Sequence, residues 1–251
     1  MSEPQIHVWL MWFMVAAGAA SAVALTFLSA PYGRHARPGW GPTLDARLGW
    51  ALMESPAVVV FLVIYLSGGN AGDAAPLALL ALWQIHYVHR TFIFPLRMPP
   101  GGKRMPLSVA AMAFGFNLLN AYINARWLSE LGTYADDWLS SPAFIIGTLI
   151  FAVGFIVNIH SDRILFRLRR ASRDYGIPHG GMYRYVSCPN YLGEIVEWIG
   201  WALAAWSPAG LAFDFFTAAN LAPRAISHHR WYRERFPDYP PERKALIPFI
   251  L

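Results

Sequence analysis

Long apolar stretches, separated by short segments rich in proline, glycine and charged residues, set the pattern of this sequence. The apolar stretches cover approximately residues 8–29, 46–66, 76–96, 107–127, 142–166, 190–206 and 209–232. A helix needs about 20 apolar residues to cross the hydrocarbon core of a bilayer, and each stretch approaches or exceeds this length. Proline and glycine mark the intervening turns, as in RMPPGGKRMP at 97–106. The pattern predicts an all-α fold with seven transmembrane helices in a single domain over residues 1–251.

The composition also indicates a polytopic membrane protein. Hydrophobic residues make up 56% of the chain and charged residues only 14%, whereas an ordinary soluble domain carries about 25% charged residues. The N-terminal sequence MSEPQIHVW lacks the basic segment and the cleavage signal of a signal peptide, so we expect the first apolar stretch to be retained as a span. Cys188 is the single cysteine, which excludes an intrachain disulfide and a multi-cysteine metal site. We expect no metal site.

Basic residues gather on one side of the predicted membrane. All but three of the 20 lysine and arginine residues lie in the loops after the first, third and fifth spans, at the ends of those spans, or around the C-terminus. Positively charged loops remain in the cytosol. We therefore expect the N-terminus outside and the C-terminus in the cytosol, which requires an odd number of spans. The net charge of +5 reflects this topology and not nucleic-acid binding, and the basic face could also hold an anionic cofactor.

Polar residues recur at helical spacing in the fifth and sixth spans, which flank a basic, glycine-rich loop. The polar residues that share one face of each helix are Asn158 and Asp162 in the fifth span, with Arg169 just beyond its end, and Asn190, Glu194 and Glu197 in the sixth. Carboxylates in a membrane-spanning helix are costly unless they are paired, and they indicate function by default.

Three further spans carry polar residues. These are Glu54 next to Pro56 in the second span, Gln84, His86, Tyr87, His89 and Arg90 in the third, and Asn220, Arg224, His228 and Tyr232 at successive i+4 steps in the seventh. Each group has a structural alternative. Glu54 could be an interfacial residue at a proline-kinked helix start, the histidines could serve helix packing, and the last stripe could extend toward the cytosolic interface.

The combined polar groups match the chemistry of a phosphorylated nucleotide. Arginine side chains form bidentate, charge-assisted hydrogen bonds with phosphate oxygens, while carboxylates and amides suit ribose hydroxyls and amide groups. No G-x-G-x-x-G sequence follows a predicted strand, so the nucleotide is not expected to bind to a Rossmann domain. The pair Gly180-Gly181 is a weak signal that an ordinary turn also explains.

Several blocks resemble a known family. The stretches HYVHRTFIFPL, NIHSDRILFRLR, GIPHGGMYRYVSCPNYLGEIVEWIGWALAAWS and HHRWYRERFPDYPPERKALIPFIL look like the steroid 5α-reductases, above all the type 1 and type 2 enzymes. The resemblance covers most of the chain from Trp50 onward. It implies a seven-helix membrane reductase that uses NADPH to reduce the 4,5 double bond of a 3-oxo-4-ene steroid.

The resemblance also implies roles for individual residues. The residues that polarise the substrate ketone correspond to Glu54 and Tyr87. The residues that bind the cofactor correspond to Asn158, Asp162, Arg169, Tyr175, Asn190, Glu194, Arg224, His228 and Tyr232. An arginine of the loop after the third span maps only loosely, onto Arg104 or onto Lys103. The chain departs from the family pattern at Met53, Met98 and Gly176. These departures leave open which residues bind the phosphate.

The implied reaction follows ordinary enone chemistry. Hydride adds to the β carbon and negative charge develops on the ketone oxygen, so the site must donate hydrogen bonds to that oxygen. Tyr87 can donate as a neutral hydroxyl, whereas Glu54 can donate only when it is protonated, the form that burial favours. A proton then reaches the α carbon from a donor that the sequence does not identify.

Other functions stay open at this stage. A related membrane bundle could reduce another sterol or enone lipid, or could methylate a substrate with S-adenosylmethionine. A seven-helix receptor or transporter could use the same polar residues to line a path for a ligand or an ion. We expect a steroid or similar lipid enone and membrane lipids as partners, and no nucleic acid. The membrane is either the bacterial cytoplasmic membrane or the endoplasmic reticulum membrane. The oligomeric state is open, and a monomer is compatible with the sequence.

Overall fold

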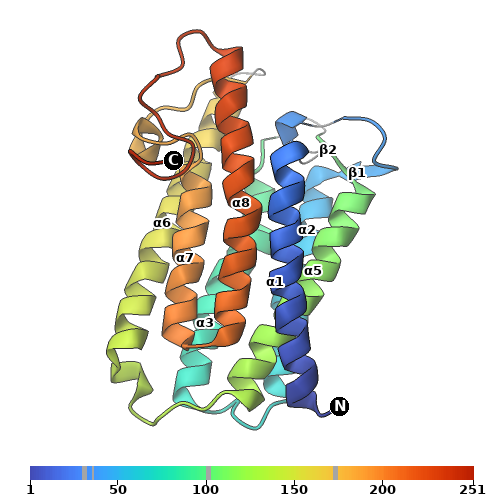
Figure 1. Ribbon diagram of the computed structural model, residues 1–251, viewed down its shortest axis with the longest axis vertical. Coiled ribbons are helices and arrows are strands. Elements are labelled where there is room, and N and C mark those ends of the chain that lie inside the picture. The colour runs from blue at the N-terminus through green and yellow to red at the C-terminus, as the bar shows by residue number, and fades with distance from the viewer. Residues whose placement is uncertain (30–32, 36, 100–102, 172–174) are drawn as a thin grey trace.

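A computed structural model describes residues 1–29, 33–35, 37–99, 103–171 and 175–251. Within these residues the chain forms an upright bundle of helices that lie side by side (Figure 1). The helices are α1 (Glu3–Phe27), α2 (Ala46–Leu66), α3 (Ala74–Val88), the short α4 (Phe94–Arg97), α5 (Leu107–Arg126), α6 (Pro142–Ala171), α7 (Pro189–Ala205) and α8 (Pro208–Arg235). The all-α class predicted from the apolar pattern is confirmed.

The helix boundaries follow local sequence signals. The Asp45 side chain accepts hydrogen bonds from the backbone N–H groups of Arg47 and Leu48 and so caps the start of α2. Pro208 lies in the first turn of α8, and Ser207 before it accepts from the backbone N–H of Gly210. The predicted third span is interrupted, because a π-helical turn over His89–Ile93 separates α3 from α4. The sequence pattern also missed a small antiparallel sheet, in which β1 (Thr43–Asp45) pairs with β2 (Arg104–Pro106).

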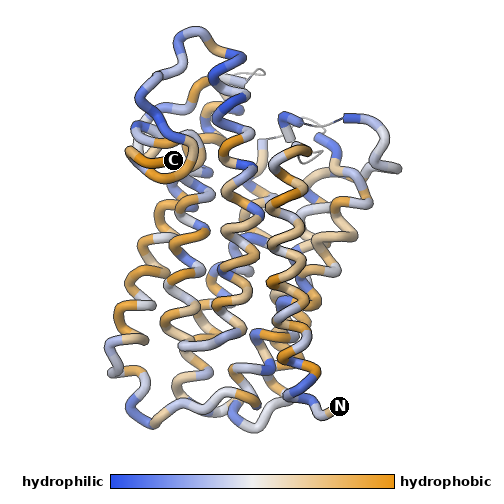
Figure 2. The backbone as a smooth tube through the Cα atoms, in the orientation of Figure 1, coloured by the Kyte–Doolittle hydropathy of each residue, from blue (hydrophilic) through white to orange (hydrophobic). Residues whose placement is uncertain are grey.

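Four helices are long and apolar enough to cross a membrane among the described residues. They are α1, α2, α5 with its π-helical extension to Leu131, and α6. In contrast, α3 has 15 residues and α7 has 17, and α8 carries the polar stripe noted above. Hydrophobic residues follow the helix shafts, and hydrophilic residues concentrate at the end that carries the C-terminal segment (Figure 2). The two chain termini lie toward opposite ends of the bundle (Figure 1).

Glycine residues bring α6 and α7 into close contact. A Cβ atom on Gly147 or Gly154 of α6 would overlap backbone atoms of α7, and one on Gly193 or Gly200 of α7 would overlap backbone atoms of α6. Small residues at a helix interface permit such close backbone approach in membranes. The seam places the polar faces of the two helices next to each other, on the side where the cavity lies.

A cluster of aromatic side chains fills the centre of the bundle. The Trp83 ring lies 5.4 Å from that of Trp198, 5.2 Å from that of Trp201 and 5.7 Å from that of Phe213. The Trp83 indole N–H donates to the backbone carbonyl of Ala57 at 2.8 Å. This cluster joins α2, α3, α7 and α8 in the hydrophobic core of the bundle.

Candidate active site

One large cavity collects almost all of the residues singled out from the sequence. It has a volume of about 640 Å³ and is lined by side chains from α1, α2, α3, α5, α6, α7 and α8, and from the segments before α2 and α5. The predicted site residues that line it are Glu54, Tyr87, Arg104, Asp162, Arg169, Asn190, Glu194, Arg224, His228 and Tyr232. Asn158 and Tyr175 lie directly behind this lining, in contact with residues that form it.

Arg90 joins α3 to the polar seam between α6 and α7. Its guanidinium lies 3.4 Å from a carboxylate oxygen of Asp162 and 3.5 Å from one of Glu194. The Asn190 amide donates to the other oxygen of Asp162 at 3.1 Å. The Asn158 amide donates to the backbone carbonyl of Asn190 at 2.9 Å and to Glu194 at 3.3 Å. The i, i+4 spacing predicted the shared faces, and the structure adds the arginine that balances the two carboxylates.

Glu197 has a different role from its neighbour Glu194. It is fully buried outside the cavity lining, and its Oε1 lies 2.7 Å from Nδ1 of His86. Glu197 follows Glu194 by three residues, so it lies on the same face of α7 but nearly one turn further along the helix, where His86 of α3 contacts it. Glu197 therefore serves the contact between α7 and α3.

Glu54 and Tyr87 reach the cavity from α2 and α3, and each is contacted by an asparagine of α5. Asn117 Nδ2 donates to Glu54 Oε2 at 3.1 Å, and Asn120 Nδ2 donates to the Tyr87 hydroxyl at 3.2 Å. The sequence analysis missed these asparagines. Their signal was present, because Asn117, Asn120 and Asn124 follow each other at helical spacing inside an apolar span.

Basic side chains surround Tyr175 at the opposite end of the cavity. The charged groups of Arg34, Lys103 and Arg169 lie 5.6, 5.2 and 5.3 Å from the centre of the Tyr175 ring. Arg34 also lies over the Tyr232 ring at 4.5 Å. Burial, followed by the nearby charges of Arg169 and Arg34, lowers the pKa of Lys103 to about 8. Arg104, the other candidate in this loop, instead donates to the side chain and carbonyl of Thr43.

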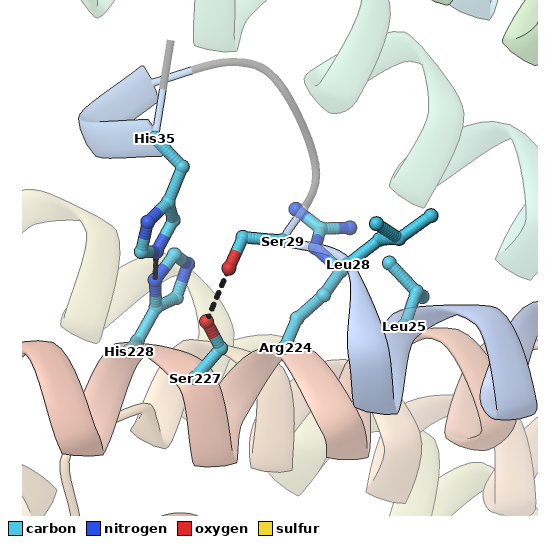
Figure 3. Close-up of a pocket in the computed structure, with 7 residues that line it drawn as sticks. All are labelled: Leu25, Leu28, Ser29, His35, Arg224, Ser227 and His228. Atoms are coloured by element: carbon cyan, nitrogen blue, oxygen red, sulfur yellow. Dashed lines mark hydrogen bonds between the residues drawn. The ribbon is translucent and has the colours of Figure 1, made fainter. Parts of the chain in front are cut away.

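The segment after α1 closes over α8 next to this basic end. His35 Nε2 lies 3.1 Å from His228 Nδ1, and the two rings are stacked with their centres 5.1 Å apart. The hydroxyls of Ser29 and Ser227 are hydrogen-bonded at 3.1 Å (Figure 3). Leu25 and Leu28 of the α1 end line the same small recess (Figure 3). The polar stripe of α8 therefore faces the bundle interior, which its helical spacing had predicted.

These features define a class of protein: a helical membrane protein with an internal cavity that is basic at one end and apolar with hydrogen-bond donors at the other. A family model described as 3-oxo-5-alpha-steroid 4-dehydrogenase matches residues 103–251. Among curated relatives, steroid 5-alpha-reductase DET2 of Arabidopsis thaliana is 46% identical over 248 residues, which is 94% of each chain. The 3-oxo-5-alpha-steroid 4-dehydrogenase 1 of Bos taurus is 41% identical and covers 96% of each chain, and that of Homo sapiens is 41% identical over 99% of this chain and 97% of its own.

The chain therefore belongs to the 3-oxo-5-alpha-steroid 4-dehydrogenase family. The resemblance drawn from the sequence blocks is confirmed, and it extends almost to the N-terminus, beyond the part from Trp50 onward that the motifs carried.

Proposed function

We propose that this chain reduces the 4,5 double bond of 3-oxo-4-ene steroids, with NADPH as the reductant. The observation that carries the proposal is the position of Glu54 and Tyr87, which line the same cavity as the basic cluster around Tyr175. The family names of the relatives agree with this reaction. One cavity thus offers donors for a ketone oxygen and cations for a phosphorylated cofactor.

The residues of the basic end fit the phosphates of NADPH. Nη1 of Arg34 is buried and has no hydrogen-bond partner among the described residues, and a buried unpaired cation is costly unless an anion accompanies it. Arg34, Lys103 and Arg169 would hold the phosphates, with Tyr175 between them. When it is bound, NADPH supplies the hydride.

The middle of the cavity would hold the rest of the cofactor. Asp162, Glu194 and Asn190 present carboxylate and amide groups that suit ribose hydroxyls and a carboxamide. The ion pairs of Arg90 keep Asp162 and Glu194 at fixed positions. Arg224, His228 and Tyr232 line the same cavity from α8. In this arrangement the reactive end of the cofactor would lie toward Glu54 and Tyr87.

Glu54 and Tyr87 would polarise the substrate. As hydride adds to the β carbon, the ketone oxygen gains negative charge, and preorganised donors stabilise that charge. Tyr87 donates its hydroxyl proton, and Glu54 donates in its protonated form. Apolar side chains of α5 and α8 complete this end, including Met112, Phe116 and Phe213. They match the apolar body of a steroid and exclude water from the reacting atoms.

We infer that all seven long helices cross the membrane, with the N-terminus outside and the C-terminus in the cytosol. The distribution of basic residues supports this orientation, and the positions of the termini toward opposite ends of the bundle agree with an odd number of crossings. The basic end of the cavity then faces the cytosol, the compartment that contains NADPH, and the apolar end lies at membrane depth.

The experiment that tests the proposal is reduction of progesterone, a 3-oxo-4-ene steroid, by the purified protein. With NADPH present, mass spectrometry should detect a product heavier by two hydrogens, and the protein should gain heat stability with NADPH and not with S-adenosylmethionine. Tyr87→Phe and Glu54→Ala should each lower turnover by about 10²-fold or more, the effect of removing one such donor, while NADPH binding is retained. Normal turnover in Glu54→Ala would remove Glu54 from the mechanism, and no product from the unmodified protein with any 3-oxo-4-ene steroid would overturn the proposed reaction.

A further inference from the structure

Three asparagine side chains lie buried in the apolar helix α5. The exposed fractions of Asn117, Asn120 and Asn124 are 4%, 0% and 1%. A buried amide is costly unless its N–H and C=O groups find partners. Their spacing of three and four residues puts the side chains on one side of the helix, facing α2 and α3 and not lipid. Their hydrogen bonds therefore show what they do there.

The direction of the Asn120 amide follows from its neighbour Asn124. Asn124 Nδ2 donates to the backbone carbonyl of Asn120 at 3.2 Å, and a backbone carbonyl can only accept. The same Nδ2 atom donates to Oδ1 of Asn120 at 2.9 Å. The oxygen of the Asn120 amide is thus committed to Asn124, and its Nδ2 is the atom that faces Tyr87 at 3.2 Å.

The direction of the Asn117 amide is fixed in the same way from α2. Asn117 Nδ2 donates to the backbone carbonyl of Met53 at 2.8 Å, so this side of the amide must be the nitrogen. The same nitrogen donates to Oε2 of Glu54 at 3.1 Å. Two backbone carbonyls, those of Asn120 and Met53, thereby determine the polarity of both contacts with Tyr87 and Glu54.

We propose that Asn120 and Asn117 are positioning residues that aim the protons of Tyr87 and Glu54 into the cavity. The Tyr87 oxygen accepts from Asn120, and among the described residues its hydroxyl has no other hydrogen-bond partner, so its single proton is free to point toward a ketone. In Glu54, Oε2 accepts from Asn117, so the proton of the acid resides on Oε1. This inference rests on the proposed reduction of a 3-oxo steroid, because it assigns the direction of the two donors in that reaction.

The test compares substitutions at Asn120 by their effects on turnover of progesterone with NADPH. Asn120→Asp keeps the size but replaces the donor with an acceptor, so the Tyr87 hydroxyl turns toward the new carboxylate. We expect kcat to fall by about 10²-fold, as for the loss of a donor to the developing oxyanion. Asn120→Ala removes the contact without misdirecting the proton, and we expect a loss of roughly fivefold, the effect of one neutral hydrogen bond.

This order distinguishes a positioning role from packing. If Asn120 only fills space, Asn120→Ala, which leaves a void, should harm turnover more than the equally large Asn120→Asp. Asn70→Asp is the matched control, because Asn70 lies in the turn between α2 and α3 and donates to the backbone carbonyl of Gly132. Its turnover should stay normal. NADPH titration on each variant verifies that the folded protein is being compared.

A double variant tests whether Asn120 acts through Tyr87. In a Tyr87→Phe background, Asn120→Asp should lower kcat by less than about threefold further, because the hydroxyl that Asn120 aims is already absent. An undiminished effect in that background, or a smaller kcat loss in Asn120→Asp than in Asn120→Ala, would overturn the positioning role. Should Asn120→Asp fail to fold, Asn120→Ala gives the same cycle with Tyr87→Phe. The unmodified enzyme reports separately on the proposed function, since it must form product in either case.

Discussion

Three cations around one tyrosine ring are unfavourable unless an anion joins them. Arg34, Lys103 and Arg169 come from three different segments and meet at Tyr175. Like charges at such separations repel, particularly where water is partly excluded. The lowered pKa of Lys103 records this repulsion together with burial. A bound phosphate would offset both effects, so the cluster predicts which form of the nicotinamide cofactor binds.

Arg169→Ala should weaken NADPH more than NADH. Loss of one charge-assisted hydrogen bond to phosphate costs about 1.5–3 kcal/mol, and NADH lacks the 2′-phosphate. Isothermal titration of the purified protein with both cofactors measures the difference. Arg167→Ala is the control, since Arg167 lies on the same helix but outside the cavity lining, and it should change neither affinity. Equal losses for NADPH and NADH in Arg169→Ala would move Arg169 away from the 2′-phosphate.

The affinity for NADPH should fall as the pH rises through about 8. Lys103 titrates there in the free protein because burial and neighbouring cations lower its pKa. Below that pH its ammonium attracts the phosphate, and above it the neutral amine does not. Lys103→Arg should flatten this dependence, because guanidinium stays charged throughout. Fluorescence titrations with NADPH between pH 6.5 and 9.5 provide the comparison. An equal dependence of affinity on pH in both proteins would exclude Lys103 as the source of that dependence.

Sequence reasoning succeeded at residues whose position a helix determines. Asn158, Asp162, Asn190 and Glu194 share faces by spacing alone, and the structure brings them together. Sequence reasoning could not identify Arg34, because this residue follows α1 in a segment without periodicity. Arg34 reaches Tyr175 only through tertiary packing. Lys103 and Arg104 were indistinguishable in sequence, and only the pairing of β1 with β2 directs Arg104 toward Thr43.

At the scale of elements, the proposed cofactor wall, which is the side of the cavity lined from α6, α7 and α8, depends on how closely α6 and α7 approach. The glycines of the seam let the backbones touch, and the hydrogen bonds of Asn158 span the gap from α6 to α7. The apolar pattern predicted both helices with nearly correct boundaries. It could not predict the seam, because a glycine inside a helix shows its partner only when the neighbouring backbone is known.

Gly154→Ala should destabilise the protein and weaken NADPH binding together. A Cβ atom there would overlap the backbone of Glu197 and Gly193, neither of which can move without shifting α7. Overpacking of this kind costs about 1–3 kcal/mol, which lowers the melting temperature by roughly 2–10 °C for a chain of this size. Thermal unfolding in detergent, monitored with and without NADPH, measures both effects.

Gly115→Ala is the matched control for this prediction. Gly115 also lies within a helix, but a Cβ atom there would meet nothing within 4 Å. Alanine favours a helix by about 1 kcal/mol relative to glycine, so the melting temperature should stay the same or rise. If both variants lose equal stability, close approach at Gly154 is not the cause.

At the scale of the whole molecule, the distribution of basic residues and the position of the basic end of the cavity indicate the same orientation in the membrane. Hydrophilic residues concentrate at the end of the bundle that carries the C-terminal segment (Figure 2), and most lysine and arginine residues lie in the loops after the first, third and fifth predicted spans or around the C-terminus. Composition alone predicted a membrane protein, and within the described part of the chain four helices are long and apolar enough to cross a bilayer. The other long helices fall short for different reasons, because α3 and α7 have only 15 and 17 residues, whereas α8 carries many polar residues.

Cysteine labelling tests the proposed orientation. Cys188 is buried, so it contributes little background to a membrane-impermeant maleimide applied to intact cells. Ser2→Cys should react from outside, whereas Glu242→Cys should react only after the cells are permeabilised. The reverse pattern would invert the proposed topology, and reaction of both residues from outside would require an even number of crossings.

The two walls of the cavity have consequences for how such a protein can diversify. The cofactor wall belongs to α6, α7 and α8, where backbone contact and ion pairs tolerate little change. The opposite wall is built from side chains such as Met53 and Met112, which adapt to new shapes with small loss of stability. Substitutions on α2 and α5 away from Glu54 and the asparagines can therefore remodel the lipid that is accepted while the redox chemistry is inherited intact. The fold thus assigns proposed cofactor binding and lipid selectivity to different helices, so that one can change without the other.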